Sequence, residues 1–363
     1  MSSKKPYDET SRARDNVRRG VKQSNYLGTA TFLGFRAADP FLQYGILSKG
    51  WANPLIQKAG GGVLPKGPPL ITSTPFDSLG LSPYRSILFA MSVGSMLKQN
   101  THLLTVQQEE MPPVSGAVIG CFNALFNSLN SIFFICSQTS ASANGEHFPQ
   151  TPLIVGSALY AVGLFTEWFS EVQRAAFKRK PENKGKVYDG GLFGLSRHVN
   201  YLGYTMWRTG YAMAAGGWTW GATVAAIFTY DFTQRGIPVL QHYLEEKYGD
   251  QYARYENAVP YKFVPPSGSK PPSPLSNPSD IEPSRNQQIR APQTPLLPHE
   301  EVLETFPPEP EPRADDLTTL AVDREWIASL RAAARDSAAF GGSDGVQWGV
   351  GGLVQRLEEG VGV

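Results

Sequence analysis

The sequence predicts an all-α fold, a polytopic membrane bundle of about six helical spans followed by a disordered C-terminal tail. Three observations lead to this prediction. The middle of the chain holds several apolar runs of roughly 20 residues, the length that crosses a bilayer once. A strongly basic loop, residues 171–198, separates two of these runs. Proline recurs every few positions after residue 265, and few apolar residues accompany it.

Averages over the whole chain conceal this pattern, because polar ends and an apolar middle cancel. The 363 residues carry a formal net charge of +1, and the mean hydropathy is -0.26. Read by segment, the chain divides into a basic cytosolic N-terminus, N-terminal membrane helices, a C-terminal membrane domain and a Pro-rich tail: residues 1–26, 27–145, 146–265 and 266–363. The first segment has no apolar run typical of a signal peptide, so we expect it to stay cytosolic.

Four apolar runs precede the basic loop. Residues 113–137 form the clearest span and residues 152–170 the next. Residues 84–104 are interrupted by Lys98. Residues 27–47 contain Arg36, Asp39 and Pro40, so they are either a span or a re-entrant hairpin.

Residues 200–232 follow the basic loop and are long enough for nearly two crossings. The Gly216-Gly217 pair predicts a tight reversal in this run, and therefore a helical hairpin. The loop before it holds many more cations than acids: Arg174, Lys178, Arg179, Lys180, Lys184, Lys186 and Arg197 against Glu171, Glu182 and Asp189. Such a loop is expected on the cytosolic side, which requires an even number of crossings before it.

Residues 266–313 lack the apolar content of a folded core and are predicted to be disordered. Residues 315–337 have the spacing of one amphipathic helix, with Leu317, Leu320, Ile327 and Leu330 near a common face. The tail is a candidate for recruiting a protein partner. Neither the two cysteines nor the isolated histidines form a metal-binding pattern, and no nucleic-acid partner is expected.

The segment LFGLSRHVNYLG, residues 192–203, concentrates polar side chains immediately before the predicted hairpin. Arg197, His198, Asn200 and Tyr201 lie within it. Charged and ionisable groups at a bilayer edge are costly unless they bind something, so this cluster predicts a functional site.

Asn123, Asn127 and Asn130 recur at helical spacing in the clearest span and therefore share one helix face. Two interpretations stay open. The amides either hold neighbouring helices together through hydrogen bonds, or they line a cavity for a substrate.

Three blocks carry a resemblance to a known family: EVQRAAFKRKP, GLFGLSRHVNYLGY and EKYGDQYARYENAVPYKFVP, at residues 171–181, 191–204 and 246–265. In order and spacing they resemble the C-terminal half of the membrane sterol and steroid reductase superfamily, which includes the sterol C14 reductases and the steroid 5-alpha-reductase-like proteins. The resemblance covers residues 150–265 and leaves residues 1–145 unmatched.

The resemblance implies a multi-pass protein of the endoplasmic reticulum membrane, an oxidoreductase that uses NADPH to reduce a carbon–carbon double bond of a sterol, terpenoid or other lipid. Phosphates need fixed cations and donors, and Arg174, Lys178 and Arg197 are the candidates. The other cofactor-binding candidates lie in the same blocks: Gln173, His198, Asn200, Tyr201, Lys247, Tyr252, Tyr255 and Tyr261. Tyr201 or Tyr204 would donate the proton.

The chain departs from the family pattern at several positions. Val199 replaces a proline, and Tyr204 stands where the family carries Glu or Asp. Val239 and Leu240 occupy the positions of an Arg-Asp pair of the C14 reductases, whereas residues 236–238 resemble the 5-alpha-reductase-like branch.

Two alternatives to the reductase remain. The first is an isoprenylcysteine-type methyltransferase that binds S-adenosylmethionine through a similar motif. Asn200, where these enzymes more often carry serine, and the position of the Glu245-Glu246 pair argue against it. The second is a non-enzymatic membrane scaffold with a degenerate reductase fold.

Overall fold

The computed structural model describes residues 22–107 and 109–264 of the chain. The predicted tail and its amphipathic helix at 315–337 lie outside this range. Within it the regular structure is helical, apart from one isolated bridge between Val63 and Cys136. The all-α prediction is therefore confirmed for the described residues.

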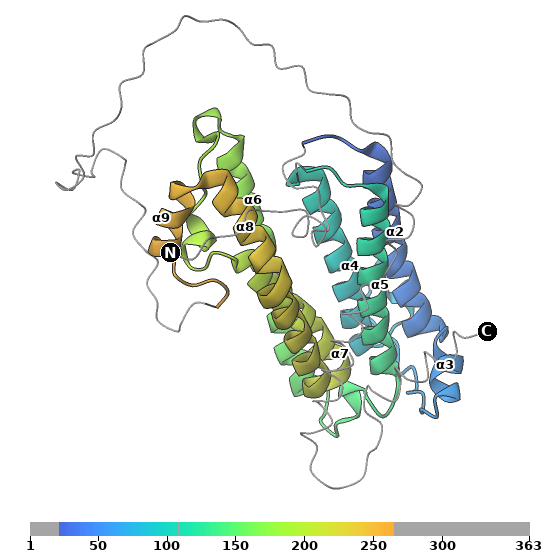
Figure 1. Cartoon of the computed structure of the whole chain (residues 1–363). Helices are drawn as coiled ribbons and strands as arrows, with labels where there is room; N and C mark the ends of the chain where they lie inside the picture. Colours follow the sequence, from blue (N-terminus) through green and yellow to red (C-terminus); the bar gives the residue numbers. More distant parts are fainter. Residues whose placement is uncertain (1–21, 108, 265–363) are drawn as a thin grey trace, which may run out of the picture. The chain divides into compact units, whose positions relative to one another are not determined.

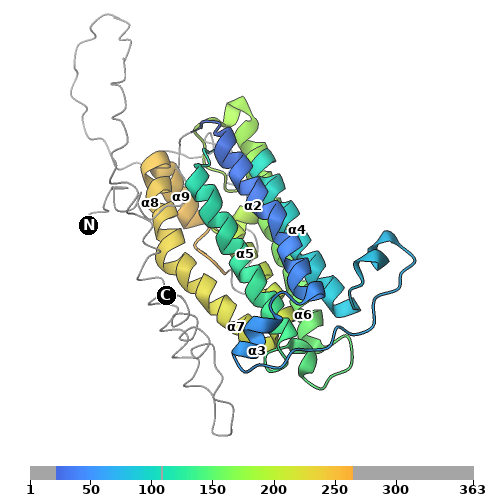
Figure 2. The same cartoon turned by 90° about the vertical axis from the view of Figure 1, so that its right-hand side faces the viewer.

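Several long helices lie side by side, and the longer connections between them, such as residues 59–82 and 180–198, contain short 3-10 turns (Figures 1 and 2). The α-helices are α2 (Tyr26–Tyr44), α3 (Asn53–Lys58), α4 (Pro83–Thr105), α5 (Pro113–Ile135), α6 (Thr151–Arg179), α7 (Val199–Asp231), α8 (Ile237–Tyr248) and α9 (Asp250–Ala258). Two π-helices are interposed, η1 (Gly45–Lys49) and η6 (Phe232–Gly236). Short 3-10 turns complete the chain: η2 (Pro75–Leu79), η3 (Ala141–Ala143), η4 (Pro181–Asn183) and η5 (Gly191–Gly194).

The predicted spans coincide with helices of the structure, although residues 113–137 extend past the end of α5 at Ile135. Residues 27–47 fall in α2 and η1, even though Pro40 lies inside α2. Among the described residues, α5 and α6 are long and apolar enough to cross a membrane. The count of about six spans stays a prediction, because polar groups lower the hydropathy of the other long helices.

α6 and α7 pack at very close range because glycines face each other along the contact. The pairs are Gly156 with Gly210 and Gly163 with Gly203, and an added Cβ at any of the four would lie within 2.6 Å of a backbone atom of the other helix. Small residues of this kind let two helix backbones approach. The side chains that flank these glycines on the two helices are therefore brought together.

The predicted reversal at Gly216-Gly217 is present. Two glycines break the helical backbone inside α7, and Gly217 has φ 74° and ψ -167°, a conformation that is essentially restricted to glycine. The second half of α7 then continues through η6 into α8 (Figure 1). Residues 199–231 thus form the helical hairpin that the sequence predicts.

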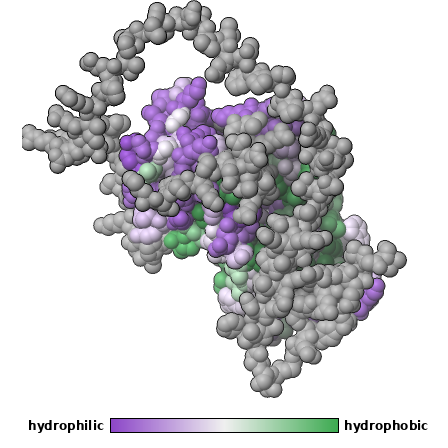
Figure 3. All heavy atoms as spheres, viewed as in Figure 1, coloured by the Kyte–Doolittle hydropathy of each residue, from purple (hydrophilic) through white to green (hydrophobic). Residues whose placement is uncertain are grey.

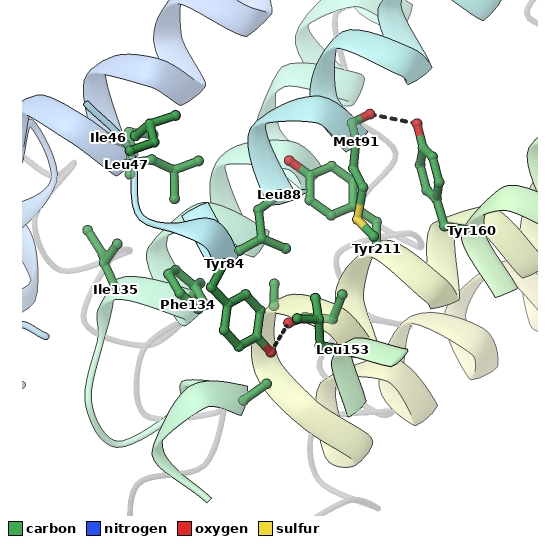
Figure 4. Close-up of a cluster of buried hydrophobic side chains, with 14 of the residues drawn as sticks. Ile46, Leu47, Tyr84, Leu88, Met91, Phe134, Ile135, Leu153, Tyr160 and Tyr211 are labelled. Carbon is green, nitrogen blue, oxygen red and sulfur yellow. Dashed lines mark hydrogen bonds between the residues drawn. The ribbon is translucent and has the colours of Figure 1, made fainter. Parts of the chain in front are cut away.

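The main apolar core joins α4 to the α6–α7 pair (Figure 4). Two buried tyrosines donate their hydroxyl hydrogens across it, Tyr84 to the carbonyl of Ala214 at 2.8 Å and Tyr160 to the carbonyl of Met91 at 2.7 Å. These bonds satisfy the polar tip of each ring while its body stays in the core.

The outer faces of α5 and α6 expose large apolar side chains, among them Val118, Leu125, Val162 and Phe165. In the view of Figure 3, hydrophilic residues gather around α8 and α9, and hydrophobic residues appear farther along the helices. Extended apolar surface of this kind marks an interaction site.

Candidate functional site

The RHVNY segment lies against the last described residues of the chain. The backbone amides of Arg197 and His198 donate to the carbonyls of Tyr261 and Lys262 at 3.0 and 3.1 Å, and the hydroxyl of Ser196 donates to the carbonyl of Phe263 at 2.9 Å. Two of the three sequence blocks are thereby joined. His198 is the N-cap residue of α7, so this pairing also sets where α7 begins.

Glu171 on α6 is the centre of the polar cluster, and it is buried. Its carboxylate accepts from Asn200 Nδ2 at 2.8 Å and from Arg174 Nε at 3.1 Å. His102 on α4 faces the same carboxylate, with Nε2 4.0 Å from Oε2. One acidic side chain therefore links α4, α6 and the start of α7.

Asn200 keeps unused hydrogen-bonding capacity at this centre. Its Oδ1 is buried, and no described residue donates to it. Buried polar atoms are normally hydrogen-bonded, so such an atom needs an explanation. The carbonyl oxygen of Asn200 is available to a donor group of a ligand.

Arg197, which is buried, forms an ion pair at 3.1 Å with Glu256 of α9, whose side chain is partly buried. Gln241 on α8 donates to the same Glu256 carboxylate at 3.0 Å. The Nε of Arg197 is buried and has no hydrogen-bond acceptor among the described residues. The predicted motif arginine is thus neutralised by a carboxylate, yet it retains one donor.

Three of the predicted aromatic residues belong to the C-terminal block. Tyr255 donates its hydroxyl hydrogen to the carbonyl of Phe193 at 2.8 Å, and Tyr252 packs beside it with ring centroids 6.0 Å apart. Burial raises the pKa of both hydroxyls, so each stays protonated at neutral pH. Tyr261 contributes its backbone carbonyl to Arg197. These contacts indicate that Tyr255 has a structural role in packing α9 against η5.

Lys178 and Lys247 form a second cationic group around Tyr248. Lys178 Nζ donates to the Tyr248 hydroxyl at 2.9 Å, and Lys247 Nζ donates to the Tyr243 hydroxyl at 2.8 Å. Both amines lie over the Tyr248 ring. Partial burial opposes the charge of Lys247, but hydrogen bonding to Tyr243 and the nearby phenol oxygens outweigh it and raise the pKa, so Lys247 is a cation at neutral pH.

Gln173 supports the turn before the motif. Its Oε1 accepts from the backbone amide of Leu192 at 3.0 Å, and it packs against Gly191. The side chain of this predicted binding residue is therefore engaged with η5.

The two predicted proton donors lie in different surroundings. Tyr201 stacks on Phe232 of the π-helix η6, with centroids 4.5 Å apart, and on His198 at 5.7 Å. The Tyr204 hydroxyl accepts from Arg208 Nε at 3.1 Å, one helical turn farther along α7. Catalysis by either residue stays a prediction.

Several residues of these clusters were not predicted as site residues from the sequence. His102 faces Glu171, and Glu256 pairs with Arg197. Glu167 contacts Lys98 and accepts from Trp207 Nε1 at 2.7 Å. Arg208 is buried in the middle of the bundle. The signal for Lys98 and Arg208 was present, because a charge inside an apolar run is itself a functional indication.

Residues 117–259 match the family model described as "Protein of unknown function (DUF1295)". The chain is 40% identical over 240 residues to the "Probable O-methyltransferase ustE" of Ustilaginoidea virens, which covers 65% of this chain and 84% of that protein. The chain belongs to the DUF1295 family. The described part of this DUF1295 protein contains the whole stretch matched by the family model.

A second relative of this DUF1295 protein is the "Protein-S-isoprenylcysteine O-methyltransferase B" of Arabidopsis thaliana, 27% identical over 115 residues. That match covers 32% of this chain and 57% of the relative. The predicted superfamily is confirmed, since the DUF1295 family belongs to the group related to steroid 5-alpha-reductases and isoprenylcysteine methyltransferases. The names of both relatives are those of methyltransferases, and neither supports the predicted reductase branch.

Proposed function

We propose that this protein is a membrane O-methyltransferase, which transfers a methyl group from S-adenosylmethionine to an oxygen atom of an apolar substrate. The names of both relatives support this assignment. It adopts the methyltransferase alternative in place of the reductase that the sequence blocks suggest. The observation that carries it is the pairing of Arg174 and of Arg197 with a carboxylate.

Charge complementarity favours this donor over a nucleotide with three phosphates. Arg174 is paired with Glu171 and Arg197 with Glu256, so each pair contributes no net charge. Phosphate groups are held by cations and hydrogen-bond donors. A sulfonium cofactor brings a positive charge instead and is compatible with neighbouring carboxylates.

Two buried atoms without a hydrogen-bond partner fit the polar groups of S-adenosylmethionine. Asn200 Oδ1 would accept from an amino group, and Arg197 Nε would donate to a carboxylate or ring nitrogen. When bound, S-adenosylmethionine supplies the electrophilic methyl group. Glu171 orients Asn200 for this role through the 2.8 Å hydrogen bond.

The setting we propose is the endoplasmic reticulum membrane, crossed several times, with residues 171–198 on the cytosolic side. α5 and α6 meet the length and hydropathy of spans, and their exposed apolar side chains would contact lipid tails. The substrate would be a lipid or sterol-like molecule that enters from the bilayer. The Pro-rich tail, outside the described residues, would serve a protein partner.

An NADPH-dependent reductase is the second candidate, and one observation favours it. Lys178 and Lys247 present two ammonium groups around Tyr248, and their hydrogen-bond partners are carbonyl and phenol oxygens. Ammonium groups with neutral partners suit the 2′-phosphate of NADPH.

A ligand-dependent unfolding experiment tests the proposal. The purified full-length chain is heated in detergent with S-adenosylmethionine, NADPH or NADH. We expect S-adenosylmethionine alone to raise the unfolding temperature, with a stabilisation of about 2.7 kcal/mol at 100 times the dissociation constant. Stabilisation by NADPH alone supports the reductase, and no response to any of the three supports the scaffold.

Asn200→Ala and Lys184→Ala provide a matched pair of variants for this measurement. Asn200 lies in the proposed donor site, whereas Lys184 is an exposed cation of the same basic loop. The response to S-adenosylmethionine should fall in Asn200→Ala and persist in Lys184→Ala. An equal response in both variants would contradict the assignment of Asn200.

A further inference from the structure

A second polar cluster lies inside the bundle, apart from the site around Glu171. It joins α2, α5 and α7, and its charged and amide side chains are buried almost completely: Arg36, Asp39, Asn123, Asn127 and Arg208. Tyr204 borders the cluster through its hydroxyl group. Nothing in the proposed donor site uses these residues.

The cluster contains two guanidinium groups and one carboxylate. Arg36 pairs with Asp39 at 2.9 Å, and Asn127 Nδ2 donates to the same carboxylate at 2.6 Å. Gln43 Nε2 donates to the other carboxylate oxygen of Asp39 at 2.8 Å, so both oxygens of Asp39 have partners within the protein. The cluster as a whole carries one positive charge in excess.

The excess charge belongs to Arg208. Its guanidinium donates to Asn127 Oδ1 at 3.2 Å, to Asn123 Oδ1 and to the Tyr204 hydroxyl at 3.1 Å. All three acceptors are neutral groups, and among the described residues no carboxylate forms an ion pair with Arg208. A buried charge without a counter-charge is expensive and marks a functional position.

One donor of the cluster also lacks a partner. The Nε of Arg36 is buried and donates to no acceptor among the described residues. The side chain of Arg36 is 0% exposed. This unused donor is a second observation, independent of the charge count, that points to a missing acceptor.

The surroundings of Arg208 are aromatic. The rings of Trp207, Phe122, Phe126 and Phe228 lie 4.3 to 5.9 Å from its guanidinium carbon. Each such contact contributes about 0.5–2 kcal/mol and disperses part of the charge. A ligand that reaches Arg208 would therefore contact aromatic rings on several sides and one positively charged guanidinium group.

We propose that this cluster binds the oxyanion of an acidic, otherwise apolar ligand. Arg208 supplies the counter-charge, Arg36 Nε supplies a free donor, and the aromatic rings contact the apolar body. The identity of this ligand as the methyl acceptor rests on the proposed function. The substrate class is then an organic acid with a hydrophobic body, rather than a neutral sterol.

The position of the cluster suits an acceptor that lies along α7. Arg208 is two helical turns beyond Asn200, or about 12 Å at the rise of an α-helix. Trp207 bridges the interval, because its Nε1 donates to Glu167 and its ring faces Arg208 at 4.3 Å. The acid group would thus anchor the ligand deeper in the bundle than the donor site.

The test introduces a carboxylate beside Arg208 by substitution, so that the protein itself provides the negative charge that we assign to the ligand. Tyr204 lies one turn from Arg208, so Tyr204→Glu places a carboxylate beside the guanidinium, while Tyr204→Gln adds a neutral side chain of the same length. The probes are 2-naphthoate, its neutral isostere 2-naphthamide, and 4-nitrophenolate under mildly alkaline conditions. The measurement is the unfolding temperature of the full-length chain in detergent.

We expect 2-naphthoate, and not 2-naphthamide, to raise the unfolding temperature of the wild type and of Tyr204→Gln. In Tyr204→Glu the apparent affinity for 2-naphthoate should fall roughly tenfold or more, which corresponds to the loss of one ion pair. A response to 4-nitrophenolate alone assigns the oxyanion to a phenol, and a response to 2-naphthoate alone assigns it to a carboxylic acid.

Three outcomes would overturn the proposal: no response of the wild type to either anion, equal responses to 2-naphthoate and 2-naphthamide, or an undiminished response in Tyr204→Glu. Each would mean that the amides and rings alone accommodate Arg208. A separate titration with S-adenosylmethionine distinguishes failure of the methyltransferase proposal from failure of the anion site. If it stabilises no variant while the anion response stands, the methyltransferase fails and the anion site survives.

Discussion

Gly163 of α6 and Gly203 of α7 face each other with no room for a side chain on either. A methyl group on Gly163 would lie 2.7 Å from the carbonyl oxygen of Gly203, and one on Gly203 would lie 2.8 Å from the carbonyl oxygen of Gly163. Gly203 is also in contact with the backbone of Glu167, one turn before Glu171. The close approach therefore sets the distance at which Glu171 meets Asn200.

Gly163→Ala should lower the stability of the protein by about 1–3 kcal/mol, the usual cost of overpacking, and should weaken binding at the Glu171 site. Thermal unfolding and the S-adenosylmethionine titration measure the two effects. Gly34→Ala is the matched control, since an added Cβ at this exposed position of α2 meets nothing within 4 Å. There the substitution should stabilise the helix by up to about 1 kcal/mol. Equal effects at Gly163 and Gly34 would argue against the tight contact.

Asn200→Asp should weaken the binding of S-adenosylmethionine more than Asn200→Ala does. The aspartate would bring a second carboxylate to Glu171, which now accepts from Asn200 Nδ2 at 2.8 Å, and two like charges repel at such a distance. Titration of each purified variant with S-adenosylmethionine gives the ranking. A milder loss in Asn200→Asp than in Asn200→Ala is incompatible with the hydrogen bond to Glu171.

Arg197 and Glu256 should show strong coupling in a double-mutant cycle. Removing Glu256 leaves the buried charge of Arg197 uncompensated, at a cost of up to about 3–5 kcal/mol, whereas removing both partners avoids that cost. The double variant Arg197→Ala/Glu256→Ala should therefore lose less stability than the sum of the losses in Arg197→Ala and Glu256→Ala. Additive effects, measured by thermal unfolding, would show that the 3.1 Å pair contributes no specific energy.

Tyr255 should make the protein sensitive to alkali. Burial raises the pKa of its hydroxyl above the value of about 10 that it has in the unfolded chain. The folded state then holds the proton more tightly, so the stabilisation is complete below pH of about 10 and is lost as the pH rises through the folded-state pKa.

Tyr255→Phe should therefore flatten the alkaline decline of the unfolding temperature. At neutral pH it should cost about 1 kcal/mol, because the carbonyl of Phe193 loses its donor. Tyr230→Phe serves as the control, since Tyr230 is 59% exposed. An alkaline decline as steep in Tyr255→Phe as in Tyr230→Phe would refute the assignment.

The sequence predicted the site residues only in part, and the reason lies in chain distance. The RHVNY segment could be recognised from the sequence, because Arg197 and His198 lie together at the edge of an apolar run. His102 and Glu256 gave no such signal. Each reaches the site from a separate helix, and contacts between remote residues leave no local period in the sequence.

The sequence by itself determined the helices, the reversal at Gly216-Gly217 and the superfamily, because apolar length, glycine pairs and short motifs are local properties. Only the tertiary structure decided that Glu171 would join His102 to Asn200, that Arg197 would meet Glu256, and that Arg208 would lack a carboxylate partner among the described residues. Those outcomes depend on which helix faces approach each other, and the glycine contact between α6 and α7 sets that approach.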